Sequence, residues 1–207
     1  MATSCGQDEQ SYRGAVQSLL ANYDAFLFDC DGTLYQADTS LPSVGEAVSY
    51  LKKLGKKIAY VTNTSARSAE QLHAKLSSMG VPCTVNECMP SGAFTAQYIK
   101  QKHPDTRRVY VIGGEGLAAE FHRVGIETDG LEDSQKKFEE AEYSAMGEAI
   151  SSVQFDGVVV GFDTAFNYYK LAKAALIFQR HPNCFFYSTN SDATDRIGQE
   201  CRMYTAE

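Results

Sequence analysis

The sequence contains no apolar run near the roughly 20 residues that a transmembrane helix requires. Positive charge is also scarce, because 19 Lys and Arg residues stand against 26 Asp and Glu residues and leave a net charge of −7. That balance argues against a nucleic-acid-binding domain and against a basic membrane-surface module. Residues 1–10 are polar and partly acidic, unlike a secretory signal. We therefore expect a cytoplasmic protein that has neither nucleic acid nor membrane as a partner.

Zinc-binding and disulfide patterns are missing as well. No two of the six cysteines form a C-x-x-C pair, and no histidine lies at zinc-finger spacing from them. Because a reducing compartment keeps thiols free, we expect six free cysteines. They are Cys5, Cys30, Cys83, Cys88, Cys184 and Cys201.

An ordinary globular composition is what remains. The chain has 207 residues, of which 43% are apolar and 22% are charged. This length suits one domain, or a small core that carries an insert. It is also long enough to bury a sizeable core.

Two short apolar runs predict strands in the first hundred residues. The runs at 25–28 and 58–61 are continuous, which is typical of strands that are buried on both faces in a parallel sheet. Asp29 and Thr62 directly follow these runs. Since chemistry in parallel sheets gathers at the carboxyl ends of the strands, both residues are candidates for a functional site.

Helical periodicity separates and follows these strands. Pro42 fits the first helical position of a helix at 42–54. Ser68 begins a helix at 68–79 with the spacing of a capping box, and a further helix is predicted at 91–102. The order strand, helix, strand, helix predicts a parallel sheet that is covered by helices.

The second half of the chain predicts another α/β unit. Strands are expected at 109–112, 158–160 and 184–187, and helices at 115–123 and 168–180. The polar stretch 131–143 is expected to be a loop or a solvated helix. The string Gly113-Gly114-Glu115-Gly116 lacks the Lys-Ser/Thr of a phosphate loop, so we expect a structural turn there.

The sharpest chemical feature is Asp29-Cys30-Asp31-Gly32, directly after the first predicted strand. Along a continuing strand the two carboxylates would point to opposite faces, but Gly32 permits a turn that lets both face one pocket. One carboxylate can then be a nucleophile that forms an acyl-phosphate, and the other a general acid and base. Backbone amides of such a turn can bind phosphoryl oxygens, and Mg²⁺ prefers oxygen ligands. The plainer alternative is a solvated turn.

Two motifs resemble those of a known family. Asp29-Cys30-Asp31-Gly32-Thr33-Leu34 resembles the first motif of the haloacid dehalogenase superfamily of phosphatases, and Val61-Thr62-Asn63-Thr64-Ser65 resembles the second. The segments Val111–Leu117, Val160–Asp163 and Thr189–Asp192 resemble the branch that contains 4-nitrophenylphosphatase, phosphoglycolate phosphatase and pyridoxal phosphatase. The resemblance covers nearly the whole chain.

The resemblance implies an α/β fold with two parts. One is a Rossmann-like haloacid dehalogenase core, of which the chain holds the N-terminal part only, and the other is an inserted α/β cap domain. We expect the core at 1–102, the cap at 103–200 and the start of the return to the core at 201–207. Because relatives in this branch often pair through the cap, a homodimer of that kind is a further expectation.

The same resemblance implies an activity and a set of residue roles. The activity is hydrolysis of a small phosphorylated metabolite, such as 4-nitrophenyl phosphate or phosphoglycolate, through an aspartyl-phosphate and with Mg²⁺ as cofactor. Asp29 would be the nucleophile and a Mg²⁺ ligand, and Asp31 would be the acid and base and bind the ion through its backbone carbonyl. Thr62 would bind the phosphoryl oxygen. The other residues expected to line the substrate pocket are Cys30, Gly32, Asn63, Thr64, Asn190 and Asp192.

Toward its C-terminus the chain departs from the family pattern. In the family, a third-motif Lys and a fourth motif of the Gly-Asp-x-x-x-x-Asp type follow the cap, whereas this chain has no Gly-Asp pair and its Lys170 and Lys173 lie within the cap. We therefore expect a fragment or a truncated gene product of a phosphatase, with its first strand at a sheet edge. The alternative is a catalytically incomplete relative that binds a phosphate ligand or a partner without turnover.

Overall fold

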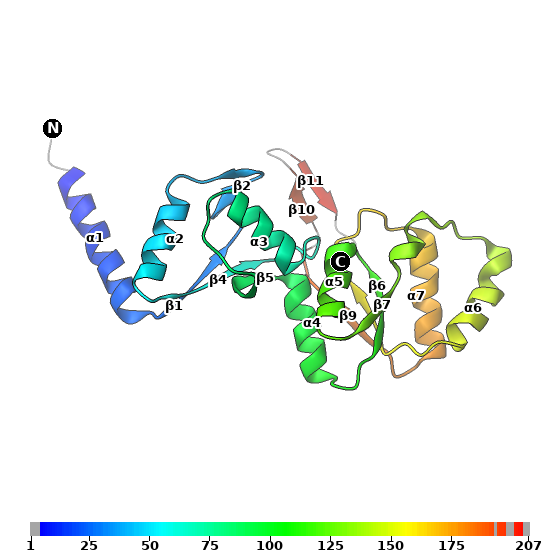
Figure 1. Ribbon diagram of the computed structural model, residues 1–207. Coiled ribbons are helices and arrows are strands. Elements are labelled where there is room, and N and C mark those ends of the chain that lie inside the picture. The colour runs from blue at the N-terminus through cyan, green and yellow to red at the C-terminus, as the bar shows by residue number, and fades with distance from the viewer. Residues whose placement is uncertain (1–4, 193, 198–200, 205–207) are drawn as a thin grey trace.

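The computed structural model describes residues 5–192, 194–197 and 201–204. Two parallel sheets with their helices lie side by side along the molecule (Figure 1), so the predicted α/β class is confirmed. Within the described ranges, no helix is both long enough and apolar enough to cross a membrane.

The first sheet is built from strands that alternate with helices. Its part of the chain forms α1 (Cys5–Asn22), β1 (Ala25–Asp29), β2 (Tyr35–Gln36), β3 (Thr39–Ser40), α2 (Val44–Lys53), β4 (Lys57–Thr62), α3 (Ala69–Ser78), η1 (Val85–Glu87) and β5 (Cys88–Pro90). The strand order is β1-β4-β5, and β2 pairs with β3 in a separate short hairpin. Apolar side chains of α2, α3 and β4, among them Val48, Leu72 and Tyr60, pack into one buried core.

The second sheet follows the same pattern. Its part of the chain forms α4 (Ser91–Lys102), β6 (Arg108–Ile112), α5 (Glu115–Arg123), β7 (Glu127–Asp129), η2 (Leu131–Gln135), η3 (Glu140–Glu142), α6 (Tyr143–Ser151), β8 (Gly157–Val160), α7 (Tyr168–Arg180), β9 (Phe185–Ser188), β10 (Thr194–Ile197) and β11 (Cys201–Tyr204). The strand order is β7-β6-β8-β9, and β10 pairs with β11 in an antiparallel hairpin. The helices predicted at 91–102, 115–123 and 168–180 are confirmed with these bounds.

The apolar run at 25–28 predicted a strand that is buried on both faces, but strand β1 is not buried in this way. Its side chains alternate between exposed and half-buried, and Leu27 is 71% exposed. Within the described part of the chain β1 pairs with β4 alone, so it is an edge strand, as the family pattern had led us to expect. The prediction from the apolar run was wrong because hydrophobicity suits a strand to burial but does not supply the neighbours that would cover it.

The start of α2 also differs from the prediction. Val44 is its first helical residue, and Ser43 occupies the N-cap with a left-handed φ of 62°. Pro42 therefore lies before the helix, because the left-handed residue interrupts the run of helical dihedral angles. Helix α3 begins as predicted, since Ser68 and Gln71 form a reciprocal capping box.

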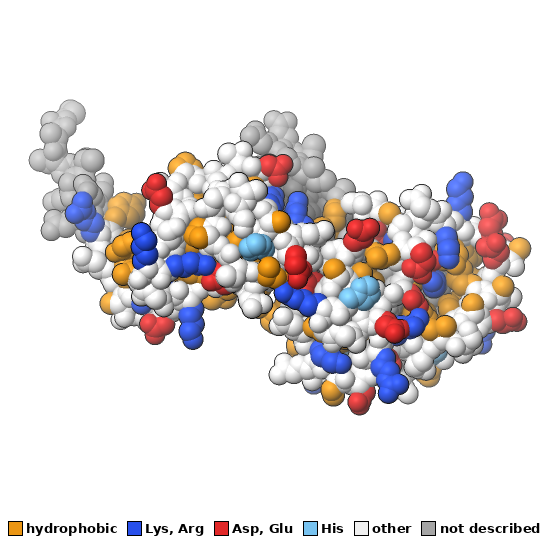
Figure 2. All heavy atoms as spheres, viewed as in Figure 1, with side chains coloured by type: hydrophobic (Ala, Val, Ile, Leu, Met, Phe, Trp, Pro, Cys, Tyr) orange, Lys and Arg blue, Asp and Glu red, His pale blue; other side chains and the backbone are white. Residues whose placement is uncertain are grey.

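The polar stretch 131–143 is only partly solvated. Exposed acidic side chains gather around α6 (Figure 2), as expected for a solvated segment. Asp133, however, is completely buried and accepts hydrogen bonds from the Tyr110 hydroxyl at 3.0 Å and the Lys173 ammonium at 2.6 Å. Burial alone would raise the pKa of Asp133, but Lys136, Lys173 and the Tyr110 hydroxyl together outweigh it and keep that pKa below its ordinary value. The run of charged residues did not reveal this burial, because Tyr110 and Lys173 lie 23 and 40 residues from Asp133 in the sequence.

Helix α4 packs with the second sheet. It precedes the predicted boundary between residues 102 and 103, yet its buried Ala96 and Ile99 lie in one cluster with Val111 of β6 and Leu117 of α5. The domain boundaries themselves stay predictions, and of the expected return segment 201–207 the last three residues lie outside the described ranges.

A buried carboxylate connects the two parts. Glu120 of α5 is 1% exposed and accepts a hydrogen bond from the backbone amide of Ala69, the first residue of α3. It therefore satisfies one of the amides that a helix N-terminus leaves unpaired. Burial raises the pKa of Glu120, although the Ala69 amide and Arg123 favour its charged form. The bond is thus made at the cost of removing a charge from water.

We expect Glu120→Gln to be at least as stable as the wild type at pH 7, because Gln keeps an oxygen acceptor for the Ala69 amide and removes the buried charge. Glu120→Ala leaves the amide unpaired and should lose about 1–3 kcal/mol of unfolding free energy. Since the folded-state pKa is raised, the charge costs stability above that pKa, and the wild type should approach Glu120→Gln as the pH falls. Urea unfolding at neutral and acidic pH measures both effects, and a Gln variant less stable than the Ala variant would contradict this.

Candidate active site

The chain turns sharply after β1. The Cys30 carbonyl accepts hydrogen bonds from the backbone amides of Thr33 at 3.2 Å and Leu34 at 2.9 Å. Gly32 adopts a left-handed φ of 81°, and its amide donates to the Tyr35 carbonyl at 2.8 Å. A side chain would strain the backbone at that φ, which explains why glycine stands there. The turn predicted from Gly32 is confirmed, and the Gly32 amide is engaged within it.

Asp29 and Asp31 both remain exposed on this turn. The Thr33 hydroxyl donates to Asp29 Oδ2 at 3.5 Å, and the Tyr35 hydroxyl donates to Asp31 Oδ2 at 3.4 Å. Tyr35 is fully buried, and burial followed by the Asp31 charge raises the pKa of its phenol, so it stays a hydrogen-bond donor at neutral pH. Each carboxylate therefore has a local hydroxyl that restrains it.

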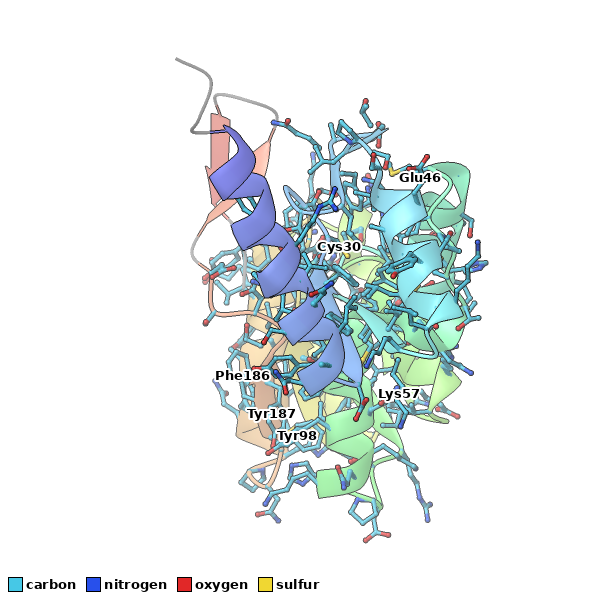
Figure 3. The ribbon with its side chains drawn as sticks, turned by 90° about the vertical axis from the view of Figure 1, so that its left-hand side faces the viewer. Cys30, Glu46, Lys57, Tyr98, Phe186 and Tyr187 are labelled. Atoms are coloured by element: carbon cyan, nitrogen blue, oxygen red, sulfur yellow. The ribbon has the colours of Figure 1, made fainter. Side chains whose placement is uncertain are left out.

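The Cys30 side chain lies inside the first part of the molecule (Figure 3), with no exposed surface. Burial, followed by the charges of Asp29 and Asp31, raises the pKa of its thiol to about 12. The thiol is thus protonated and shielded, so Cys30 can offer a ligand only backbone groups. The cysteines whose side chains are described are all free, namely Cys30, Cys83, Cys88 and Cys184.

Strand β4 brings the second motif to the same sheet edge. Its parallel register aligns Asp29 with Val61, so Thr62 lies one residue beyond, at the carboxyl end of the strand. Thr62 is buried, and its Oγ1 accepts a hydrogen bond from the Thr64 amide at 3.4 Å. The Thr64 hydroxyl accepts one from the Ala66 amide at 3.2 Å. These two local bonds fold the residues after β4 into a tight loop.

The loop after β9 reaches the loop after β4. Asn63 Nδ2 donates to Asp192 Oδ2 at 3.1 Å, and Asn190 Nδ2 donates to the Asn63 carbonyl at 3.4 Å. These partners lie 129 and 127 residues from Asn63 in the sequence. Three residues that the resemblance assigned to the substrate pocket are therefore brought together, and they bond to one another.

Two serines hold the loop after β4 and were missed from the sequence. The Ser91 hydroxyl donates to the Asn63 carbonyl at 2.8 Å, and the Ser91 amide donates to the Thr64 carbonyl at 3.2 Å. Ser65 is buried, and its Oγ accepts a hydrogen bond from the Phe162 amide at 2.7 Å. Ser91 begins a predicted helix and Ser65 closes the second motif, but neither position reveals its distant partner.

Glycines allow the second part to approach this loop closely. A Cβ on Gly161 would lie 2.6 Å from Ser65 Oγ, and a Cβ on Gly116 would lie 2.6 Å from the Ala66 carbonyl oxygen. The string that ends at Gly116, predicted as a structural turn, is the start of α5 instead: Gly114 is the N-cap, and Glu115 and Gly116 are already helical. These glycines serve backbone packing between the two parts.

Lys170 and Lys173 are both engaged in ion pairs inside the second part. Lys170 Nζ lies 2.6 Å from Asp163 Oδ2, with side-chain exposures of 0% and 3%. Lys173 Nζ lies 2.6 Å from the buried Asp133. Each ammonium is thus offset by a local carboxylate of the second part.

The turn after β1 offers the ligand chemistry of a hard cation. Asp29 and Asp31 present carboxylate oxygens, the ligands that Mg²⁺ prefers, and both charges act on the same neighbour, the Cys30 thiol. A bound cation would offset this shared negative charge. Among the side chains that the structure describes, no group of three or more His, Cys, Asp or Glu could hold a metal ion. The oxygens of Asp29 and Asp31 are therefore of the type that Mg²⁺ prefers, but these two residues do not complete a metal site by themselves.

Residues 26–127 match the family model described as haloacid dehalogenase-like hydrolase. The chain is 37% identical over 184 residues to phosphoglycolate phosphatase 2 of Arabidopsis thaliana, which covers 87% of the chain and 60% of that relative. It is 34% identical over 184 residues to the 4-nitrophenylphosphatase of Schizosaccharomyces pombe, which covers 86% of the chain and 60% of that relative. Residues 26–127 thus carry the sequence pattern of a haloacid dehalogenase-like hydrolase.

A solved structure shares the fold of this chain. A hypothetical protein from Pyrococcus horikoshii is similar with a TM-score of 0.71 and 34% identity, over 88% of this chain and 63% of that chain. The fold class implied by the two motifs is thereby confirmed. The chain spans 60% to 63% of the length of these three proteins.

In the folded protein, iodoacetamide near neutral pH should alkylate Cys83 well before Cys30. Cys83 is half-buried, whereas Cys30 has no exposed surface and a raised thiol pKa. Timed labelling followed by peptide mass spectrometry measures both rates, and urea unfolding should make them similar. Equal rates before unfolding would show that Cys30 is accessible beside the two carboxylates.

Proposed function

We propose that the intact protein is a Mg²⁺-dependent phosphomonoesterase that hydrolyses a small phosphorylated metabolite through an aspartyl-phosphate. One observation carries the proposal: Asp29 and Asp31 lie on a tight turn at the carboxyl end of β1, beside the end of β4 at Thr62. The names of the relatives, phosphoglycolate phosphatase and 4-nitrophenylphosphatase, support small phosphate esters as substrates. Pairing of two copies through the cap stays a prediction.

In the proposed reaction the two carboxylates have different roles. An Asp29 oxygen attacks phosphorus, the ester P–O bond breaks, and Asp31 gives its proton to the departing alcohol oxygen. Asp31 then takes a proton from water, the water oxygen attacks phosphorus, and the acyl-phosphate bond breaks to release phosphate and restore Asp29. The Tyr35 hydroxyl, at 3.4 Å from Asp31 Oδ2, would hold the acid and base in place.

Residues around the turn would hold the phosphoryl group and the ion. Thr62 ends β4 beside the turn, and its hydroxyl can donate to a phosphoryl oxygen. The Asp29 carboxylate and the backbone carbonyl of Asp31 would hold Mg²⁺, which when bound offsets the negative charge that opposes a phosphate near two carboxylates. The Gly32 amide donates to Tyr35, so we assign Gly32 to shaping the turn.

Expressed from its intact gene, Asp29→Asn should lose about 10³-fold or more of kcat on 4-nitrophenyl phosphate with Mg²⁺, because an amide oxygen is a poor nucleophile. The matched control is Asp38→Asn, the same charge change at an exposed carboxylate that pairs with Lys75 at 3.5 Å. Urea unfolding should be nearly the same for both variants and the wild type. Retained turnover in the folded Asp29→Asn protein would end the nucleophile assignment.

The second candidate is a catalytically incomplete relative that binds a phosphate ligand or a partner without turnover. It is favoured because no third His, Cys, Asp or Glu among the described side chains completes a metal site with Asp29 and Asp31, and because ion pairs engage Lys170 and Lys173. For this candidate, inorganic phosphate with Mg²⁺ should raise the Tm of the 207-residue chain while no ester is hydrolysed. An unchanged Tm would weigh against it.

The intact mass of the protein in its native cell separates the two candidates. Immunoprecipitation followed by mass spectrometry gives this mass directly. A mass well above that of 207 residues favours the phosphatase, because the additional residues can supply the third-motif Lys and the fourth-motif Asp of the family. A mass equal to that of 207 residues favours the binding protein, and activity would then require a second chain.

A further inference from the structure

The Asn63 side chain and carbonyl both contact the second part of the molecule. Asn63 directly follows Thr62, the residue that we propose binds the phosphoryl group. Its Nδ2 donates to Asp192 Oδ2 at 3.1 Å, and its carbonyl accepts from Asn190 Nδ2 at 3.4 Å. The resemblance assigned all three residues to the substrate pocket, but the polar groups named here bond to one another.

The orientation of the Asn190 amide is fixed by two independent bonds. Its Oδ1 accepts the backbone amide of Asp192 at 2.9 Å, so its Nδ2 must be the group that faces the Asn63 carbonyl. The Ser188 hydroxyl also bonds to the Asn190 carbonyl. The loop 188–192 is therefore folded on itself in a shape that presents Asn190 and Asp192 together.

The other side of the contact is held as firmly. The Ser91 hydroxyl donates to the Asn63 carbonyl at 2.8 Å, and Ser91 is the first residue of α4. Helix α4 buries Ala96 and Ile99 in the core of the second part. Asn63 thus lies between two attachments to the second part, one through α4 and one through the loop 188–192.

We propose that Asn63 is a positioning residue that forms a latch with Asn190 and Asp192. The latch holds the loop 188–192 against the loop after β4, at the edge where Asp29 and Thr62 lie, and it forms without substrate. Its contribution to catalysis rests on the proposed function, but the latch itself does not. If Asn63 instead contacted only the substrate, its substitution would leave the amides of the loop 188–192 equally protected from hydrogen exchange.

Hydrogen–deuterium exchange of the loop 188–192, without substrate, tests the latch in a set of matched variants. Asn63→Asp places two carboxylates face to face, and Asp192→Ala removes the acceptor, so each should speed exchange about tenfold if one charge-assisted hydrogen bond is lost. Asp192→Asn keeps an oxygen acceptor for Asn63 Nδ2 and should exchange like the wild type. The double variant Asn63→Asp/Asp192→Asn swaps donor and acceptor and should restore protection.

The control is Asn86→Asp, which makes the same charge change at an exposed residue of η1 and should leave the exchange of 188–192 unchanged. Because Asp192 is exposed, Asp192→Ala keeps the test valid even if Asn63→Asp disturbs folding. Unchanged exchange in both single variants overturns the latch, as does a double variant that exchanges as fast as Asn63→Asp. If 4-nitrophenyl phosphate is turned over, a raised KM with unchanged exchange assigns Asn63 to substrate contact and also overturns it.

Discussion

In the parallel register of β1 and β4, Asp29 lies opposite Val61, so the loops that follow both strands leave the sheet at the same edge. Everything that we assign to the site depends on this pairing. It places a turn with two carboxylates beside a strand end with a buried hydroxyl at Thr62. Without the shared edge, two motifs 33 positions apart along the chain, from Asp29 to Thr62, could not form one site.

The loop after β4 serves both the site and the joint between the two parts. Asn63 and Ser65 bond to the loops after β9 and β8, and the next helix, α3, receives Glu120 at its N-terminus. Gly161 lets the second part come within van der Waals contact of Ser65. A loop fastened at several points costs little further ordering when a ligand binds, which favours a preformed site.

Buried ion pairs constrain the second part of the molecule. Lys170 with Asp163, and Lys173 with Asp133, are pairs in which removing one partner would leave the other unpaired in a medium of low dielectric constant. Such pairs hold the loop after β8 and the short helix η2 against α7. They also explain why two lysines of a helix rich in apolar residues do not face water.

The sequence by itself determined the local features: the turn at Gly32, the capping box of Ser68, the bounds of several helices, and the two carboxylates after an apolar strand. These depend on dihedral preferences and on spacing within one turn or strand, which neighbouring residues specify. Only the tertiary structure decided that α4 packs with the second sheet, that Asp133 is buried, and that Asn63 meets Asp192 across 129 residues. Those outcomes depend on which distant segments pack together, and local sequence periodicity does not specify that packing.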